Sequence, residues 1–224
     1  MLTISLSGSV IANGKEPNAE FLSKFAKLIS RTNDRFVVVA GGGSLAKNYI
    51  AALRKNARNE YLLDMVGIKA TEMNAYALLV ALEGAGVNAA MAQTINDIPL
   101  ALAHFKAVVL YGQLPGITTD TDAALACEIA KCKKLVNVSK LAYIYNKPPE
   151  QAGAKKIKKL SHAALIKIAE SYDDRTAKAK FAFDIVACKI AARAGIEIRF
   201  VDDRLENIKR ALMGSAFDGT LVKD

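Results

Sequence analysis

The chain has 224 residues, of which 52% are hydrophobic, and a formal net charge of +9 at pH 7. This length and apolar content favour one compact unit around a large core. The chain contains no tryptophan and no aromatic-basic signature, which argues against a nucleic-acid partner. We find no apolar run of about 18 residues and no basic signal-like start, so we expect a cytoplasmic protein with no membrane contact.

The positive charge is concentrated in one part of the chain. Residues 131–180 contain 13 Lys and Arg against 4 Asp and Glu, whereas the remainder contains 18 of each. A solvated face explains most of these lysines, and attraction of a polyanionic ligand to one lobe is the alternative.

Strand-like runs alternate with helical patterns from end to end, which predicts an α/β fold with a mostly parallel central sheet. The predicted strands span residues 2–6, 37–40, 87–91, 107–111, 135–138, 143–145 and 196–201, with a last edge strand at 219–222. One helix is expected to be capped by Asn18 and another to be opened by Ser44. Further helices are expected near 73–83, 120–132, 161–170, 181–194 and 203–213.

The strand at 37–40 ends at Gly41, Gly42 and Gly43. A β-branched run of this kind suits a strand buried on both faces, and glycine lets the backbone approach an anion closely. The N–H groups at the start of the following helix would face that anion. The pattern indicates a phosphate cradle, and a turn used only for tight packing is the alternative.

Two further loops follow predicted strands, Ser7-Gly8-Ser9 and residues 112–120. The carboxyl ends of parallel strands meet at one sheet edge, so all three turns are expected to open into one crevice. In the last loop, Thr118 and Thr119 offer hydroxyl groups at a helix start, and Asp120 is either a helix cap or a site carboxylate.

The three cysteines, Cys127, Cys132 and Cys188, lack C-x-x-C spacing and fall in apolar helical patterns. We interpret them as small core residues, in neither a disulfide nor a zinc site. His104 and His162 are interpreted as incidental to any chemistry.

Several motifs in order resemble the uridylate kinases of the amino acid kinase superfamily, archaeal type, over nearly the whole chain. They are D-M-V-G-I-K-A-T-E-M-N-A at 64–75, the glycine turn, P-G-I-T-T-D at 115–120, F-D-I-V-A at 183–187, and Gly214 with Gly219-Thr220. The resemblance implies an αβα sandwich, a single domain at 1–224 with an acceptor lobe at about 1–125 and a donor lobe at 126–224, and a hexamer by analogy.

The resemblance also implies transfer of the terminal phosphoryl group of ATP, with Mg²⁺ carried by the nucleotide and no metal site in the protein, to UMP. The implied UMP-binding residues are Gly41, Gly42, Gly43, Lys47, Asp64, Gly67, Thr71, Thr118, Thr119 and Asp120. The implied catalytic residues are Gly8, Ser9, Lys140 and Asp184, with Asp184 holding basic partners in place. The implied donor-nucleotide residues are Gly8, Ser9, Ser139, Lys140, Tyr145 and Lys147. Such chemistry depends on positioning and charge stabilisation and needs no protein nucleophile.

The chain departs from the family pattern mainly on the donor side. Ser5 stands where many relatives have lysine, and Ala142 and Tyr143 replace the Asp-Gly of the donor loop. Lys147 replaces the Asp of a following Asp-Pro, and Lys47 replaces the arginine of the glycine turn. Lys140, Lys189 and Lys47 are the candidates for positive charge at the transfer point, and Lys189 is equally well explained as a solvent-facing helix residue.

Three alternatives stay open at this point. The first is a UMP-binding or nucleotide-sensing relative without productive donor binding. The second is a kinase of another small phosphate acceptor, such as isopentenyl phosphate, although the histidine typical of that family is absent from residues 44–47. The third is an oxyanion-storage relative, for which the chain lacks histidine-rich metal chemistry.

Overall fold

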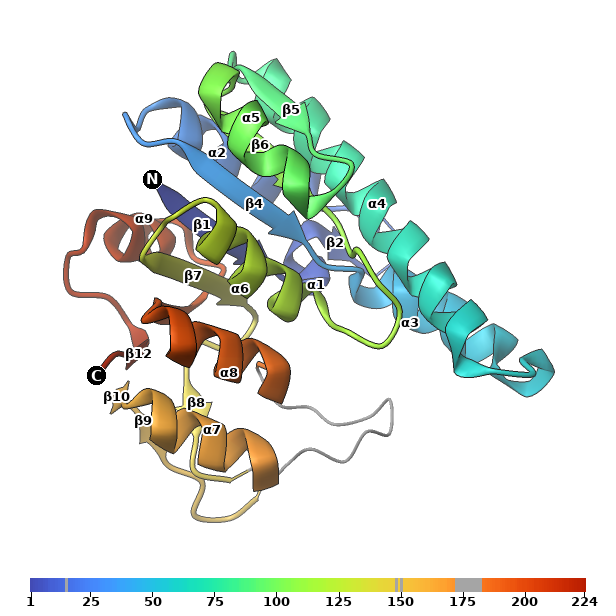
Figure 1. Ribbon diagram of the computed structural model, residues 1–224, viewed down its shortest axis with the longest axis vertical. Helices are drawn as coiled ribbons and strands as arrows, with labels where there is room; N and C mark the ends of the chain where they lie inside the picture. The colour runs from blue at the N-terminus through green and yellow to red at the C-terminus, as the bar shows by residue number, and fades with distance from the viewer. Residues whose placement is uncertain (15, 148, 150, 172–182) are drawn as a thin grey trace.

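The computed structural model describes residues 1–14, 16–147, 149, 151–171 and 183–224. Its centre is an eight-stranded sheet in the order β10-β12-β11-β7-β1-β4-β6-β5 (Figure 1). Its strands along the chain are β1 (Leu2–Leu6), β4 (Phe36–Ala40), β5 (Ala89–Met91), β6 (Ala107–Leu110), β7 (Lys134–Ser139), β10 (Lys159–Leu160), β11 (Glu197–Asp202) and β12 (Gly219–Val222). Neighbouring strands run parallel except β11 and β12, which confirms the mostly parallel sheet.

Helices cover both faces of this sheet, so the fold is the expected αβα sandwich (Figure 1). The helices are α1 (Gly8–Ile11), α2 (Ala19–Ser30), α3 (Gly43–Leu53), α4 (Glu60–Gly84), α5 (Ile98–His104), α6 (Thr119–Ile129), α7 (His162–Ser171), α8 (Ile185–Ala194) and α9 (Leu205–Met213). Two short 3₁₀ helices are η1 (Arg54–Asn56) and η2 (Ile95–Asp97). One core lies between the sheet and α2, α4 and α9, and the other between the sheet and α5 to α8.

Two short antiparallel pairs lie outside the main sheet. One joins β2 (Ala12–Asn13) to β3 (Glu16–Pro17), and the other joins β8 (Ile144–Tyr145) to β9 (Lys156–Ile157). The strand predicted at 143–145 is therefore real, but it belongs to a separate hairpin outside the main sheet.

Local chemistry explains the elements that the sequence predicts best. The Asn18 side chain accepts a hydrogen bond from the Phe21 amide at 3.2 Å and caps α2, whose buried face includes Phe25 and Ile29. All residues of β4 are buried, because helices pack on both faces of that strand. Gly195 ends α8 in the left-handed conformation, φ 61°, as expected of a glycine at this position.

The structure corrects several predicted boundaries. The helix after the glycine turn begins at Gly43, and the Ser44 hydroxyl donates to the Gly14 carbonyl instead of capping it. The helix predicted at 73–83 is the final half of α4, which begins at Glu60 behind an Asn59 cap. The strand at 219–222 is internal, because β10 pairs with its free side. Helix α8 begins at Ile185, and residues 181–182 of its predicted span lie outside the described residues.

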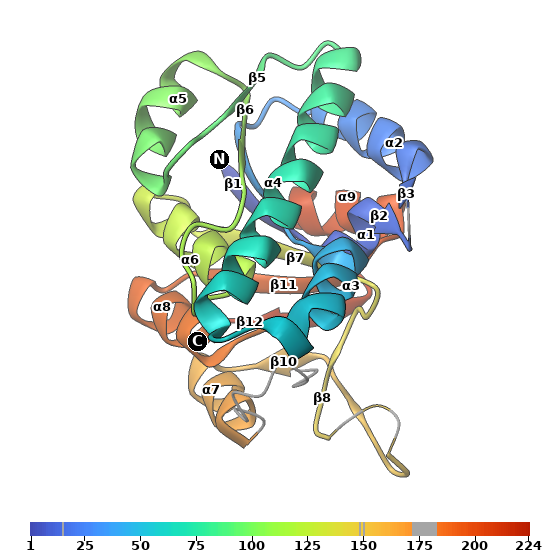
Figure 2. The ribbon, with the colours of Figure 1, turned by 90° about the vertical axis from the view of Figure 1, so that its right-hand side faces the viewer.

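Helix α4 bears on the expectation that the chain makes no membrane contact. Its 25 residues are long and apolar enough to do so by length and composition, and 33% of its most apolar window is buried. Figure 2 shows α4 packed beside α3 and running across the sheet. Leu63, Ala70, Leu78 and Leu82 face the protein interior, which accounts for part of its apolar character.

The cysteine prediction was wrong in one respect. Cys127 and Cys132 form a disulfide, which joins the end of α6 to the turn before β7. A turn at 129–132 folds back and brings together two sulfur atoms whose spacing in the sequence gave no indication of pairing. Cys188 is a free, buried thiol in the core, as predicted.

Candidate functional site

The three turns predicted to converge do lie at one edge of the sheet. Strands β1, β4 and β6 are adjacent and parallel, and the turns follow their carboxyl ends. The first two turns touch through their backbones: a Cβ atom added to Gly8 would lie 2.1 Å from the Gly43 nitrogen, and one added to Gly43 would lie 2.3 Å from the Gly8 carbonyl carbon. Gly43 also has φ +60°, which side chains rarely adopt. The glycines are therefore required for the close packing of the two turns, and at Gly43 also for the left-handed backbone conformation.

Helix α4 fixes the glycine turn from one side. The Asn74 Nδ2 donates to the carbonyl oxygens of Gly41 at 2.7 Å and Gly42 at 3.2 Å. Three residues earlier, the Thr71 hydroxyl accepts a hydrogen bond from the Gly112 amide at 2.8 Å. Thr71 therefore links α4 to the loop after β6 and does not lie free for a ligand. The sequence interpretation missed Asn74, although its i+3 spacing from Thr71 places both on one helix face.

The first turns of α4 approach the loop at 112–118. The half-buried Asp64 carboxylate accepts a hydrogen bond from the Gly116 amide at 2.9 Å. Gly67 lies against α3, where an added Cβ would meet the Ile50 side chain at 3.3 Å, so its visible role is helix packing. Lys47 lies on the exposed side of α3 and forms no ion pair with the part of the chain that the structure describes.

The start of α6 settles the two interpretations of Asp120. The exposed Thr118 is the helix cap, because its hydroxyl accepts from the amides of Asp120 at 3.2 Å and Thr121 at 3.4 Å. Thr119 is the first helical residue and is half-buried. Asp120 instead turns its carboxylate to the sheet, where Oδ1 accepts from Ser5 Oγ at 2.9 Å and Asn137 Nδ2 at 2.8 Å. The cap reading of Asp120 is therefore wrong, because its carboxylate bonds to β1 and β7 and not to the helix start.

Asp184 joins this group from the start of α8. Its Oδ1 caps the helix by accepting from the Val186 amide at 2.9 Å and the Ala187 amide at 3.1 Å. The same carboxylate accepts hydrogen bonds from the hydroxyl groups of Thr118 and Thr121. Asp184 thus ties α8 to the start of α6. Its hydrogen bonds within the described residues go to hydroxyl and amide groups and not to the basic partners that we expected.

A second buried carboxylate, Asp122, lies behind the first and was missed by the sequence interpretation. Its Oδ2 accepts from the Gln113 amide at 3.2 Å, and its Oδ1 is buried without a hydrogen-bond partner among the described residues. Burial, chiefly, raises the pKa of Asp120 to about 7, with the Asp184 carboxylate adding to the shift. Burial also raises the pKa of Asp122 to about 7, with smaller contributions from the Asp184 and Asp120 carboxylates. The Asp184 carboxylate is therefore near enough to both Asp120 and Asp122 to raise their pKa values.

Of the predicted donor residues, Gly8 and Ser9 lie in α1 directly after β1, and the other four lie at the end of β7 and in or beside the β8–β9 hairpin. The Ser139 hydroxyl donates to the Leu141 carbonyl at 2.8 Å, and Lys140 forms an ion pair with Asp203. Tyr145 pairs with Lys156 in the hairpin. Lys147 lies beside Gly153, where an added Cβ would be 3.2 Å from its Nζ, and Pro148 lies outside the described residues.

Tyr143 is buried within this donor segment. Its hydroxyl donates to the Asp218 carboxylate, and Lys156 Nζ lies 4.8 Å from the centre of its ring. The ring therefore fills space that a glycine in the donor loop would leave open.

Lys189 and His162 have no visible role in the candidate site. Lys189 is exposed and lies 3.8 Å from Glu170, which supports its reading as a solvent-facing residue. His162 is buried, with Nε2 2.8 Å from the Ile196 carbonyl oxygen, on α7 away from the glycine turns. Ser9 Oγ lies 3.0 Å from Ser7 Oγ in the turn after β1, next to Gly8.

Comparison with known proteins identifies the family. The model of the amino acid kinase family matches residues 1–202. A uridylate kinase of Thermoplasma acidophilum is 33% identical over 100% of this chain and 96% of its own length, and one of Thermoplasma volcanium is 34% identical over 100% and 97%.

Solved structures give the same result. A uridylate kinase of Archaeoglobus fulgidus superimposes with a TM-score of 0.85 at 31% identity, covering 99% of each chain. A UMP kinase of Bacillus anthracis, at 17% identity and a TM-score of 0.83, covers 100% of this chain and 95% of its own and shares the fold. Since the family model and the relatives match nearly the whole chain, the protein belongs to the amino acid kinase family, in its uridylate kinase branch.

Proposed function

We propose that this protein transfers the terminal phosphoryl group of Mg-ATP to the phosphate of UMP, giving UDP. One observation carries the proposal: the glycine turns after β1 and β4 meet backbone to backbone, and α4 and the start of α6 border the same edge. Two phosphate-bearing substrates bound at these turns would be held close together, which is what in-line phosphoryl transfer needs.

The acceptor would lie against the turn at 41–43. Backbone N–H groups there and at the start of α3 suit its phosphate, and Lys47 is the nearest cation in sequence. Asp64 is suited to the ribose hydroxyl groups, and Thr118 to the nucleotide at the end of the loop. The Gly116 amide donates a hydrogen bond to the Asp64 carboxylate and so orients it.

Mg²⁺ takes oxygen ligands, and the residues at the transfer point fit it. The Asp120 Oδ1 accepts two hydrogen bonds, whereas no hydrogen bond from the described residues reaches its Oδ2. The Asp120 and Asp184 carboxylates would therefore lie beside a Mg²⁺ carried in by the nucleotide. When bound, the ion offsets the negative charge of the phosphates.

The protein's own contribution is positioning. The backbone amides of the turns orient both phosphates, and the buried network of Ser5, Asp120 and Asn137 holds the start of α6 against β1 and β7. No side chain has to accept a proton, because the attacking UMP phosphate oxygen is already ionised at neutral pH.

Formation of UDP from UMP and Mg-ATP tests the proposal, with GTP and CTP as alternative donors. A Lys47→Ala variant should lower kcat/KM for UMP about tenfold. Lys55→Ala removes an equal charge from the same exposed region and should change it less than about twofold. Clear UMP binding without turnover with any donor would instead support a nucleotide sensor.

The protein is further proposed to act in the cytoplasm as a homo-oligomer, a hexamer by analogy with the family. Helix α4 exposes Met73, Tyr76 and Val80 on one side, at spacings of three and four residues. A contiguous apolar surface of this kind is typical of a subunit interface. Light scattering should show an oligomer in the wild type that Val80→Lys disrupts, whereas Leu100→Lys, at an equally exposed site on α5, leaves it intact. A monomeric wild type would contradict the proposal.

A further inference from the structure

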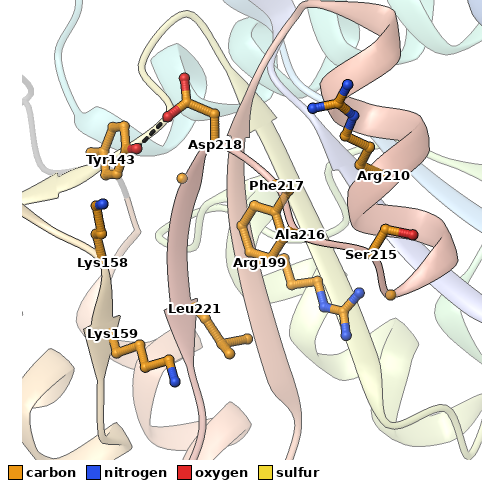
Figure 3. Close-up of a pocket in the computed structure, with 12 residues that line it drawn as sticks. Tyr143, Lys158, Lys159, Arg199, Arg210, Ser215, Ala216, Phe217, Asp218 and Leu221 are labelled. Atoms are coloured by element: carbon orange, nitrogen blue, oxygen red, sulfur yellow. Dashed lines mark hydrogen bonds between the residues drawn. The ribbon is translucent and has the colours of Figure 1, made fainter.

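A second cavity lies beside α9, away from the glycine turns. It has a volume of about 590 Å³ and opens over β10, β12 and β11. Figure 3 shows Lys158 and Lys159 on one side of it and Arg199 and Arg210 on the other, with Phe217 and Leu221 between them. None of the glycine-turn residues lines it. Its volume falls within the usual range for small-molecule sites.

The cavity carries an excess of positive charge. Four of its lining side chains are cationic, and one, Asp218, is a carboxylate. Asp218 is already engaged by the Tyr143 hydroxyl and by Arg204. Both lysines are exposed and form no ion pair with any residue in the described ranges, and Arg210 reaches Glu206 only at 3.5 Å. The charges of the two lysines and of Arg210 are therefore available to a ligand, whereas Arg199 is paired with Glu197. The two lysines come from the segment that holds the whole excess charge of the chain.

The far wall is rigid and partly apolar. Arg199 is buried, its Nε donates to Glu197 Oε1 at 2.7 Å, and its guanidinium also donates to the Ala211 carbonyl. The same guanidinium lies 5.8 Å from the centre of the Phe217 ring. Arg199 thus holds the Phe217 ring in place, and with Leu221 this ring offers an apolar surface between the cationic groups.

We propose that this cavity binds a phosphorylated small molecule. Its phosphate groups would lie among Lys158, Lys159 and Arg210, and its remaining part would lie on Phe217 and Leu221. A neutral ligand would gain nothing from the cationic side chains, whereas a ligand with two or more negative charges matches the charge of the cavity.

The position of the cavity gives it access to the donor segment. Asp218 lines the cavity, and its hydrogen bond to Tyr143 connects it to the loop that follows β7. A ligand bound in this cavity would therefore affect donor binding, and this consequence rests on the proposed function. The existence of the binding site does not rest on it, because ligand binding can be measured without UMP or turnover.

Calorimetric titration with inorganic tripolyphosphate tests the proposal on the full chain. The Lys158→Ala/Lys159→Ala variant should bind about tenfold or more weakly than wild type at low salt. The control Lys27→Ala/Lys209→Ala removes the same charge from a separate groove between α2 and α9, and should change the affinity less than about twofold. Lys47→Ala reports on the glycine turn, the competing phosphate site, and should leave the binding that depends on Lys158 and Lys159 in place.

Three results would overturn the proposal. They are equal binding by the cavity variant and its control, loss of binding in Lys47→Ala alone, and no binding to wild type at about 1 mM tripolyphosphate. Since both lysines are exposed, thermal melting of the cavity variant should match wild type, so a loss of binding reports on the site and not on folding. If the protein failed to form UDP from UMP, the proposed function would be wrong, but the tripolyphosphate affinities of the wild type and the variants would be unaffected.

Discussion

The Ser5 hydroxyl donates a hydrogen bond to the Asp120 carboxylate at 2.9 Å, across the contact between β1 and α6. Ser5 stands at the position where many members of the family carry lysine. A neutral donor there satisfies one oxygen of the carboxylate but cannot compensate its charge. Burial and the nearby Asp184 carboxylate therefore raise the pKa of Asp120 to about 7.

This pKa predicts how stability depends on pH. The pKa of Asp120 in the folded protein lies above the value of about 3.9 expected when unfolded, so the folded state binds the proton more tightly. The free energy of unfolding should therefore fall as pH rises from about 4 to about 7, and the contribution of Asp120 should level off above that.

Asp120→Asn keeps an acceptor for Ser5 and removes the charge. It should raise the free energy of unfolding at pH 8 by about 1 kcal/mol or more and weaken the dependence between pH 4 and pH 7, leaving the part that Asp122 contributes. Urea unfolding across this pH range measures both effects. Asp34→Asn, an exposed carboxylate paired with the chain amino group, serves as control. An unchanged pH profile in Asp120→Asn would show that Asp120 ionises normally in the fold.

The packing of the two glycine turns predicts that the loss of stability on replacing a glycine with alanine depends strongly on its position. Gly43→Ala should cost about 3 kcal/mol or more, because its Cβ would collide with the Gly8 backbone as well as adopt a left-handed conformation. Gly86→Ala has a similar φ, +74°, with open space around it, and should cost only about 1 to 2 kcal/mol. Thermal or urea unfolding compares the pair. Equal losses of stability in the two variants would show that the two glycine turns move apart readily to accommodate the added Cβ atom.

Asp64 offers a direct test of the acceptor site. Asp64→Ala should reduce the thermal stabilisation by UMP, with affinity falling about tenfold or more, because a charge-assisted bond to the ribose would be lost. The unliganded protein should lose only about 1 kcal/mol, from the bond to the Gly116 amide. Glu60→Ala, one turn earlier on α4 and paired with Arg54 at the surface, should leave UMP binding unchanged. Normal stabilisation of Asp64→Ala by UMP would remove Asp64 from the site.

Tyr143 should limit donor binding because its ring fills the donor loop. Replacing Ala142 and Tyr143 with Asp and Gly should raise kcat/KM for ATP about tenfold, at a cost in stability of about 3 kcal/mol from the cavity created. Tyr143→Phe keeps the ring, loses only the bond to Asp218, and should leave the KM for ATP within about twofold. If the double replacement leaves donor kinetics unchanged, the ring does not obstruct the nucleotide.

The sequence predicted the fold because its signals are local and periodic. The apolar strands at 2–6 and 37–40, the Asn18 cap and the glycine at 195 each specify local backbone geometry, and their alternation specifies a parallel sheet. The sequence alone also carried the family motifs around residues 41–43, 64–75 and 115–120. The glycine turn and the loop at 115–120 meet because neighbouring parallel strands bring their following turns to one edge.

Only the tertiary structure decided which polar groups bond to one another. Thr118 caps α6 while Asp120 turns to Ser5 and Asn137, Asp184 pairs with hydroxyl groups, and Thr71 binds the Gly112 amide. The Cys127–Cys132 disulfide and the cationic cavity beside α9 likewise arise from residues that the chain brings together in space. The reason is physical: a backbone conformation follows from a few neighbouring residues, whereas a side-chain partner and the charge it compensates depend on which distant segments pack against it.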